Sequence, residues 1–463
     1  MHSADASDRA LVDTGARVGL REPLLVFALA LLTNFLWLGR KSVWLDEAVS
    51  VEHTLGGFRN VLYANGWQDP NSGLYYLLLT AWTRVFGTGE WIIRAPSAVL
   101  AAATTVLVYL IGLHLSGRAT ARLAALLIAL NAYVITFGQT ARGYALVLFL
   151  VTLATWCLVR SQETPSRAIA ALYVASAVLS FHAHYFGVLV VAAHGLALLV
   201  SGRLRRVHVY CAIVIAIACL PMLYIAATHG RAEVAWIQVP TPRTLLLALT
   251  NLAGISLPAL GLLSALALRS VTSSRDTSGR WRTNLLLTWL LLPLLSVYML
   301  SQRVPLFHSR YFLICAPALV LLAVSGVAQL RSGRVRAAAI AALVIATIWP
   351  LPEYYRDRGY EAWREAAAYV KSSPAASAAV LYSPRYARPP FAYYERRYAS
   401  PALTNLARKP LSGQPAIWLV ERLENSTTQR LEGDSLRAVL GREYQLQESR
   451  EFTQVRASLY VRR

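Results

Sequence analysis

The chain has 463 residues, of which 56% are hydrophobic, and its formal net charge is +21. A mean hydropathy of +0.44 and recurrent apolar runs of about 17 to 25 residues exclude an ordinary soluble protein and indicate a polytopic membrane protein. The basic residues are mostly arginines in short clusters between these runs. This arrangement is typical of positive-inside topology and argues against a nucleic-acid partner.

The apolar runs predict about eleven membrane-spanning helices. Residues 1–22 form a polar N-terminal tail without a cleavable signal pattern, so we interpret the first run as an uncleaved anchor. The predicted spans are residues 23–39, 91–114, 120–137, 143–160, 168–183, 185–201, 207–227, 244–268, 284–301, 311–330 and 335–352. If the N-terminus is cytoplasmic, every cytoplasmic connection carries arginines and the chain after residue 352 lies outside.

Residues 73–87, GLYYLLLTAWTRVFG, are the one apolar stretch that disturbs this alternation. The stretch is short, contains Arg84, and has tryptophan and tyrosine where an interfacial helix carries them. We therefore predict a helix that lies at the outer membrane surface. The alternative, a full crossing, would reverse every later connection and place the arginine clusters outside.

The first predicted outer loop, residues 40–90, contains a pair of adjacent carboxylates. Asp46 and Glu47 lie in the stretch SVWLDEAVSVEH, a few residues beyond the first span. Charges so close to lipid are costly and are often functional. Asp46 could alternatively cap a helix, Glu47 could only orient or tune its neighbour, and Asp69 could simply begin a turn.

The other predicted outer loops carry cations and aromatic side chains instead of carboxylates. The candidates lie in QTARGY, FHAHYF and QRVPLFHSRYF, and they are Arg142, Tyr144, His184, Tyr185, Arg303, His308, Arg310 and Tyr311. Planar arginine donors suit a phosphate, and such a set predicts an anionic, lipid-linked substrate. The alternatives are snorkelling arginines at the span ends and a structural hydrogen bond for His184.

After residue 352 the composition becomes polar and charged. Residues 353–463 contain short apolar pieces such as AAVLYS and AIWLV between turn-forming residues, which predicts a small extracytoplasmic α/β domain. The predicted organisation is therefore a cytoplasmic tail (1–22), a membrane domain (23–352) and this soluble domain (353–463).

Several motifs, taken in order, resemble one family of membrane enzymes. In this chain the motifs are WLDEAVS, DPNSGLYYLLLTAW with VFG and EWIIRAPS, QTARGYAL, HAHYFG and HSRYFLICAPAL. The order of these motifs resembles that in the protein-mannosyltransferase-like glycosyltransferases. This GT-C class includes the protein O-mannosyltransferases and the aminoarabinose transferase of lipid A. The resemblance covers roughly residues 25 to 400 and implies an α-helical GT-C membrane fold. It also implies that Asp46 is the catalytic base.

The resemblance further implies an inverting transfer from a polyprenyl-phosphate sugar to a lipid, glycan or protein acceptor, at the outer face of the bacterial inner membrane. Arg142 and Arg310, with Arg303 or His308, would stabilise the departing lipid phosphate. A divalent cation could share that task, but no ligand set in the sequence is compelling, and no other cofactor is expected.

One segment departs from the family pattern. Many relatives have D-x-H-P-P-L-Y-Y where this chain has Asp69 followed by PNSGLYY. Asp69 is retained, but Asn71 stands at the histidine position, which weakens any metal site inferred through this segment.

The alternative class of function is a polytopic transporter or lipid flippase. Such proteins usually place ionisable residues near the bilayer midplane and have repeated halves, and this sequence shows neither feature. A non-catalytic membrane scaffold whose tail binds partners is a third, weaker hypothesis.

Overall fold

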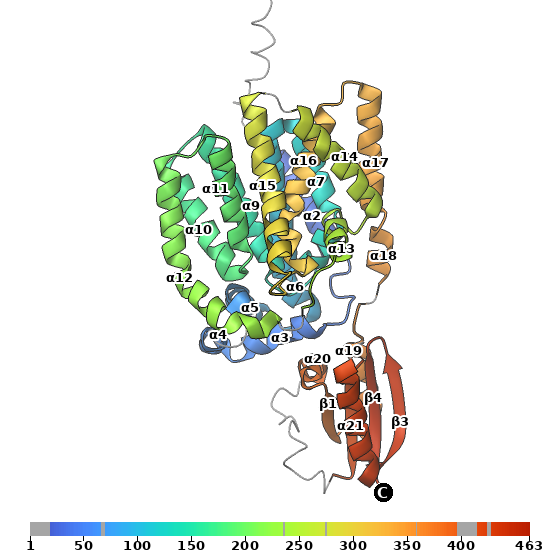
Figure 1. Ribbon diagram of the computed structural model, residues 1–463. Helices are drawn as coiled ribbons and strands as arrows, with labels where there is room; N and C mark the ends of the chain where they lie inside the picture. The colour runs from blue at the N-terminus through green and yellow to red at the C-terminus, as the bar shows by residue number, and fades with distance from the viewer. Residues whose placement is uncertain are drawn as a thin grey trace, which may run out of the picture. The chain divides into compact units, whose positions relative to one another are not determined.

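The computed structural model describes residues 19–65, 70–234, 237–273, 276–357, 359–395, 414–423 and 427–463. This part of the chain is mostly helical and contains one four-stranded sheet (Figure 1). It divides into two compact units. The first contains the described residues up to Leu36, Val61–Leu78 and Arg94–Tyr354, and the second contains Trp37–Asn60, Leu79–Ile93 and Tyr355–Arg463.

The helices that belong wholly to the first unit are α2 (Arg21–Phe35), α7 (Arg118–Ala129), α8 (Ala132–Gly138), α9 (Tyr144–Glu163), α10 (Arg167–Ala183), α11 (Gly187–Val200), α12 (Arg206–Val234), α13 (Pro242–Leu252), α14 (Leu257–Ser273), α15 (Thr277–Leu300), α16 (Ala316–Ala328) and α17 (Gly333–Ile348), with the short 3-10 helices η1 (Pro70–Ser72) and η2 (Ser309–Cys315). Three helices contribute residues to both units: α4 (Gly57–Asn65), α5 (Gly73–Phe86) and α6 (Glu90–Ser116). A fourth helix, α18 (Leu351–Arg356), also contributes residues to both units.

The described helices confirm a multi-pass membrane protein. Six of them are long and apolar enough to cross a bilayer, and the number rises to eight if two bent helix pairs each count as one span. The helices α10 and α11 are apolar but shorter. All the predicted spans coincide with helices of the structure, while the count of eleven crossings stays a prediction.

Two predicted spans are bent helix pairs in the structure. Residues 120–137 form α7 and α8, which meet at 60°, and residues 244–268 form α13 and α14, which meet at 84°. At the first break, the Asn131 side chain accepts hydrogen bonds from the backbone of Tyr133 and Val134, both at 3.0 Å. At the second, Gly254 has a φ of +86°, which favours glycine. Both breaks therefore have local causes in the sequence.

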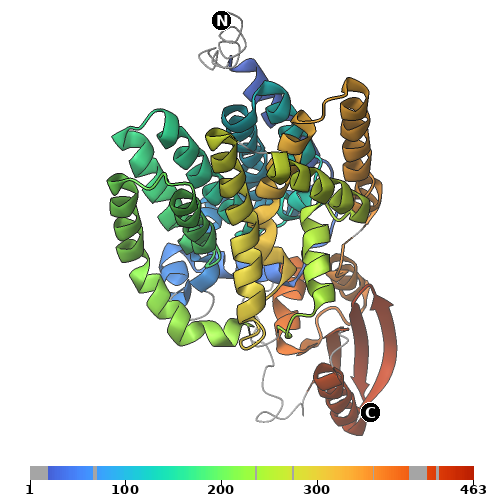
Figure 2. The same ribbon diagram turned by 45° about the horizontal axis from the view of Figure 1, so that its top comes forward.

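The helices of the first unit differ greatly in how much protein covers them. In each segment, part of the most apolar stretch is buried inside the protein. The buried share is 89% in the segment formed by η2 and α16, but only 17% in α12 and 22% in the segment Gly333–Arg356, which contains α17. Figures 1 and 2 show α15 and α16 in the middle of the bundle, with α12 and α17 on opposite sides. Exposed apolar side chains on the outer helices suit contact with lipid.

Residues 73–86 form the helix α5, which has 14 residues. At 1.5 Å per residue it is about 21 Å long, shorter than the roughly 30 Å hydrocarbon core of a bilayer. The predicted helix is thus present, and its predicted position at the membrane surface remains a prediction.

The second unit contains the predicted α/β fold. Its helices are α3 (Leu45–Leu55), α19 (Trp363–Ser372), α20 (Arg388–Glu395) and α21 (Thr427–Glu443), with a single 3-10 turn η3 (Arg385–Ala387), and its strands are β1 (Ala379–Ser383), β2 (Ala416–Arg422), β3 (Tyr444–Phe452) and β4 (Val455–Arg462). The strand order is β1-β2-β4-β3, with β1 and β2 parallel and the other pairs antiparallel.

The apolar pieces AAVLYS and AIWLV become the parallel strands β1 and β2. In β2, Trp418 and Val420 pack into a cluster with α19, while Ile417 and Leu419 pack on the opposite face with α21 residues such as Leu440. A strand covered on both faces needs a continuous apolar run, which explains the sequence of β2.

Candidate functional site

The predicted phosphate-binding residues come mainly from three turns of the first unit. These turns are residues 139–143 between α8 and α9, residues 184–186 between α10 and α11, and residues 308–311 at the start of η2. Each turn places polar or aromatic side chains at a helix end, where the backbone leaves the regular helical pattern.

The first turn presents Arg142 and is held by several contacts. Gln139 donates hydrogen bonds to the backbone oxygens of Asn34 (3.0 Å) and Leu36 (2.9 Å). At Gly143, an added Cβ would lie 3.1 Å from the backbone oxygen of Ala183, so the close approach of the two turns favours glycine. The motif QTARGY therefore encodes a fixed turn.

Arg142 contacts a tyrosine that the sequence had not singled out. Its Nη1 donates a hydrogen bond to the hydroxyl of Tyr76 at 2.5 Å, and its guanidinium carbon lies 5.9 Å from the centre of that ring. Tyr76 is completely buried in α5. The motif GLYY marks a pair of tyrosines, Tyr75 and Tyr76, but does not indicate which of them contacts the arginine.

The second turn brings His184 into a group of aromatic rings. Its ring centre lies 4.9 Å from that of Tyr311, 5.4 Å from that of Phe186 and 5.8 Å from that of Tyr144. The side chain of His184 is almost completely buried. Three separate segments of the sequence therefore meet around this histidine.

The third turn supplies the second arginine. The guanidinium of Arg310 lies 5.8 Å from the ring centre of Tyr144 and 5.6 Å from that of Tyr311. The Nδ1 atom of His308 accepts a hydrogen bond from the backbone N–H of Arg310 at 3.4 Å, and the His308 ring lies 5.7 Å from Tyr311. Arginine next to aromatic faces is favourable and fixes the direction of the guanidinium.

We call the residues of these three turns, together with Tyr76, the ring cluster: Tyr76, Arg142, Tyr144, His184, Tyr185, His308, Arg310 and Tyr311. Tyr185 lies in the second of these turns, and its backbone N–H donates to the Oδ1 atom of Asn71 at 2.9 Å. Asn71 thus ties the segment before α5 to the turn between α10 and α11.

Arg303 is the predicted phosphate-binding residue that lies apart. It is exposed in the turn after α15, where its backbone N–H donates to the oxygen of Leu300 at 3.0 Å. Among the described residues, no contact of its side chain joins it to the ring cluster.

The predicted carboxylates belong to the second unit, at the N-terminus of α3. Asp46 is half-buried and Glu47 is completely buried. The Oε2 atom of Glu47 accepts a hydrogen bond from the backbone N–H of Trp44 at 3.4 Å. Carboxylates in the first turn of a helix are also stabilised by the helix dipole.

A third carboxylate, which sequence reasoning missed, binds the same helix end. Glu361 is 1% exposed, and its Oε2 atom accepts a hydrogen bond from the backbone N–H of Leu45 at 2.9 Å. Its partners also include Trp363 and Arg422. Because Glu361 lies 316 positions after Leu45, no local motif could have indicated this contact.

Two predictions remain, a functional role for Asp69 and a possible divalent cation. Asp69 lies outside the described residues. Within the described ranges, no group of three or more histidine, cysteine, aspartate or glutamate side chains could hold a metal ion.

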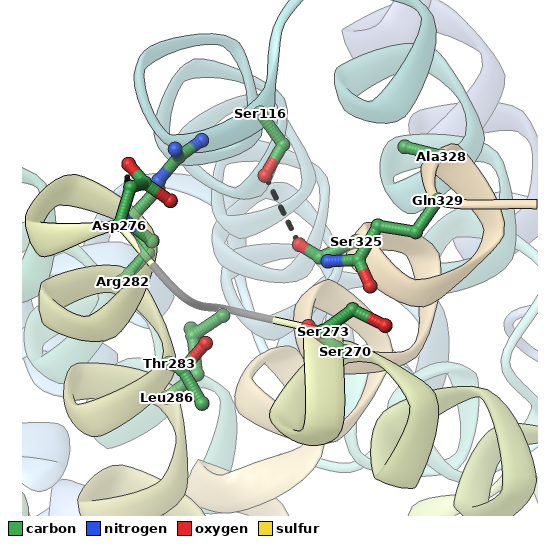
Figure 3. A pocket seen from close by; sticks show the side chains of 11 residues that line it. Ser116, Ser270, Ser273, Asp276, Arg282, Thr283, Leu286, Ser325, Ala328 and Gln329 are labelled. Carbon is green, nitrogen blue, oxygen red and sulfur yellow. Dashed lines mark hydrogen bonds between the residues drawn. The ribbon is translucent and has the colours of Figure 1, made fainter.

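A polar cavity of about 310 Å³ lies elsewhere in the first unit. It is lined by the ends of α6, α14 and α16 and the start of α15, and Ser116 and Ser325 share a hydrogen bond of 3.0 Å there (Figure 3). None of the predicted site residues lines this cavity. It lies among the connections that the arginine pattern predicts to be cytoplasmic.

Comparison with known proteins supports the fold. Residues 72–225, about a third of the chain, match the family model described as dolichyl-phosphate-mannose-protein mannosyltransferase. A Bacillus subtilis (strain 168) protein named "Putative mannosyltransferase YkcB" is 26% identical over 152 residues. This match spans 30% of the chain and only about a fifth (21%) of the relative.

Solved structures resemble nearly the whole chain. Apo ArnT from Cupriavidus metallidurans has a TM-score of 0.64 at 12% identity, covering 95% of this chain and 98% of ArnT. The same protein bound to undecaprenyl phosphate also has a TM-score of 0.64, at 13% identity, covering 94% and 97%. The archaeal oligosaccharyltransferase AglB from Archaeoglobus fulgidus, in complex with an inhibitory peptide and a dolichol-phosphate, has a TM-score of 0.52 at 12% identity, covering 94% and 74%. The GT-C fold that the motif order implied is therefore confirmed.

Proposed function

We propose that this chain, which has the GT-C membrane fold, is an inverting glycosyltransferase. It moves a sugar from a polyprenyl-monophosphate carrier to a lipid, glycan or protein acceptor at the outer face of a bacterial cytoplasmic membrane. The observation that carries this proposal is the ring cluster, in which Arg142 contacts Tyr76, and Arg310 lies beside the rings of Tyr144 and Tyr311. The fold of ArnT, a protein that binds undecaprenyl phosphate, supports the choice of carrier.

The proposed domain arrangement follows the arginine pattern. The N-terminal tail is cytoplasmic, residues 23–352 form the membrane-embedded catalytic domain, and residues 353–463 lie outside the cytoplasm. In this orientation the carboxylates of α3 and the ring cluster both belong to outer segments.

In the proposed reaction, Asp46 removes the proton from an acceptor hydroxyl or amine. The acceptor atom then forms a bond to the anomeric carbon while the bond from that carbon to the phosphate oxygen breaks. Attack opposite the leaving group inverts the anomeric centre. A carboxylate is suited to this task because it can receive the proton as the acceptor attacks.

The departing lipid phosphate gains negative charge as this bond breaks. Arg142 and Arg310 donate to it, His308 can donate through its other ring nitrogen, and the exposed Arg303 adds to the positive field. Planar, charge-assisted donors are most effective where charge develops in the transition state. Glu47, which is held at the helix N-terminus by Trp44, orients Asp46. Asp69, in the same loop, is a further candidate for a catalytic role.

A transfer assay tests the proposal. The purified protein in lipid nanodiscs is incubated with a panel of polyprenyl-phosphate hexoses and pentoses, and with membrane glycolipids, glycans and peptides as acceptors. We expect one donor to lose its sugar with inversion, read by mass spectrometry and by NMR of the anomeric proton. Binding of the carriers without transfer, together with movement of the carrier across a vesicle membrane, would instead identify a flippase.

A further inference from the structure

The segment that precedes α3 is held by residues from the far C-terminal part of the chain, all within the second unit. This segment, residues 39–45, is short and has no regular secondary structure before Leu45. Its backbone groups therefore need partners elsewhere. Three side chains supply them: Glu361, Arg364 and Tyr394.

Glu361 fixes the first helical residue of α3. In addition to its bond with Leu45, its Oε2 atom accepts from the indole of Trp363 at 2.6 Å, and its Oε1 atom accepts from Nε of Arg422 at 2.9 Å. Both of its partner side chains lie in the C-terminal α/β part of the unit. A buried carboxylate with a full set of partners is rigid, so it holds the N–H of Leu45 in one place.

Arg364 binds the backbone just before that point. Its guanidinium donates to the backbone oxygens of Gly39 (3.0 Å), Arg40 (3.1 Å) and Lys41 (3.2 Å). It also forms an ion pair with Glu90, to which its Nε atom donates at 2.9 Å. The Arg364 side chain thus binds three successive backbone carbonyl groups and a carboxylate at the start of α6.

Tyr394 completes the contacts from α20. Its hydroxyl accepts a hydrogen bond from the backbone N–H of Val43 at 2.7 Å and donates to Glu90. Burial, together with the Glu90 carboxylate, raises the pKa of Tyr394 well above its ordinary value, so the hydroxyl keeps its proton at neutral pH. The backbone from Gly39 to Leu45 is therefore bound at five places by residues that follow position 360.

We infer that Glu361, Arg364 and Tyr394 are positioning residues for Asp46, and that the C-terminal α/β part is therefore required for turnover. This inference rests on the proposed role of Asp46 as the base. Asp46 is the next residue after Leu45, so a shift of the helix end moves its carboxylate directly. Small errors in the position of a catalytic group reduce turnover strongly.

The chain offers a matched control in a second buried carboxylate. Glu421 is 3% exposed and pairs with Arg437 and Arg456 of the same unit. Among the described residues, its ion-pair partners belong to the C-terminal part, and neither lies in the first loop. Glu421→Gln therefore disturbs a comparable buried ion pair without touching the segment before α3.

The test compares Glu361→Gln and Tyr394→Phe with Glu421→Gln, each in the full chain. We expect the first two to lower kcat by about 10- to 100-fold, with donor Kd changed less than about 2-fold, because the phosphate contacts belong to other residues. Glu421→Gln should lower the unfolding temperature but leave kcat within about 2-fold of wild type. Amide hydrogen exchange should show faster exchange at Val43 and Leu45 only in the first two variants.

A double substitution separates positioning from general damage. In an Asp46→Asn background, adding Glu361→Gln should cause almost no further loss of kcat, because a residue that acts through Asp46 has nothing left to position. Full additivity, or a Glu361→Gln enzyme with normal kcat, would overturn the inference while leaving the proposed function intact. Absence of transferase activity in the wild-type protein would instead remove the proposed function, and hydrogen exchange would still report whether Glu361 and Tyr394 hold the segment.

Discussion

The ring cluster and the N-terminus of α3 are built in opposite ways. In the ring cluster, short motifs place their own side chains: His308 accepts from the backbone of Arg310, and His184 accepts from the backbone of Phe186 two residues later. At α3, Asp46 follows a segment whose partners lie more than 300 positions away. The cluster is rich in cations and rings, whereas α3 begins with carboxylates.

This contrast suggests a division of labour. Arginines near aromatic rings suit a bound phosphate, and a carboxylate at a fixed helix end suits proton removal. We therefore expect substitutions in the ring cluster to act on donor affinity and substitutions around α3 to act on turnover.

The largest expected effect concerns membrane topology. A division of labour between the ring cluster and the N-terminus of α3 is possible only if both face the same side of the membrane. We expect a membrane-impermeant maleimide to label Glu365→Cys, which is exposed in α19, and to spare Ser278→Cys, which is exposed in α15. The four native cysteines are buried, which keeps the background low. The reverse labelling pattern would refute the N-in assignment and the outer location of both regions.

The next effect is on turnover. Asp46→Asn keeps the size of the side chain but cannot accept the proton, so we expect kcat to fall by roughly 10²- to 10⁴-fold. Donor binding should persist. The matched control is Glu52→Gln, which removes one carboxylate from the same helix and breaks only an ion pair with Arg388 at 3.5 Å. Near-normal turnover by Asp46→Asn would remove the base assignment.

The ring cluster could be predicted from local motifs, whereas the contacts around α3 could not, because they join distant parts of the sequence. Hydropathy identified the helical segments, and AAVLYS and AIWLV correctly predicted strands. The motifs QTARGY, HAHYF and HSRYF indicated residues that the structure brings together, because each motif carries its own turn. Glu361, Arg364 and Tyr394 could not be identified, since their contacts depend on the folded sheet and helices of the second unit. Tyr76 was missed because an apolar helix gives no sign of which tyrosine meets an arginine.

A smaller effect is expected for the arginines. Replacing Arg142 or Arg310 with alanine should weaken donor binding by about 10- to 100-fold, since charge-assisted hydrogen bonds contribute roughly 1.5–3 kcal/mol each. Lysine should restore only part of the affinity, because it lacks the planar fork. Binding of a fluorescent polyprenyl phosphate measures this, with Arg269→Lys as the control, whose Nη2 donates to the oxygen of Gln329 instead. Unchanged donor affinity in both alanine variants would reduce these residues to interfacial anchors.

The smallest effect tests whether the ring cluster needs support from outside its own motifs. Asn71→Ala removes the acceptor for the backbone N–H of Tyr185, a bond of 2.9 Å between two segments 114 positions apart. Since a typical hydrogen bond contributes about 0.5–1.5 kcal/mol, donor affinity should fall by roughly 2- to 10-fold while kcat at saturating donor stays the same. Asn284→Ala, which loses a 3.0 Å bond to Ser201, is the matched control and should leave both quantities unchanged. A fall in kcat with normal affinity would show that this turn also affects turnover, and the separation between the two regions would then fail at Asn71.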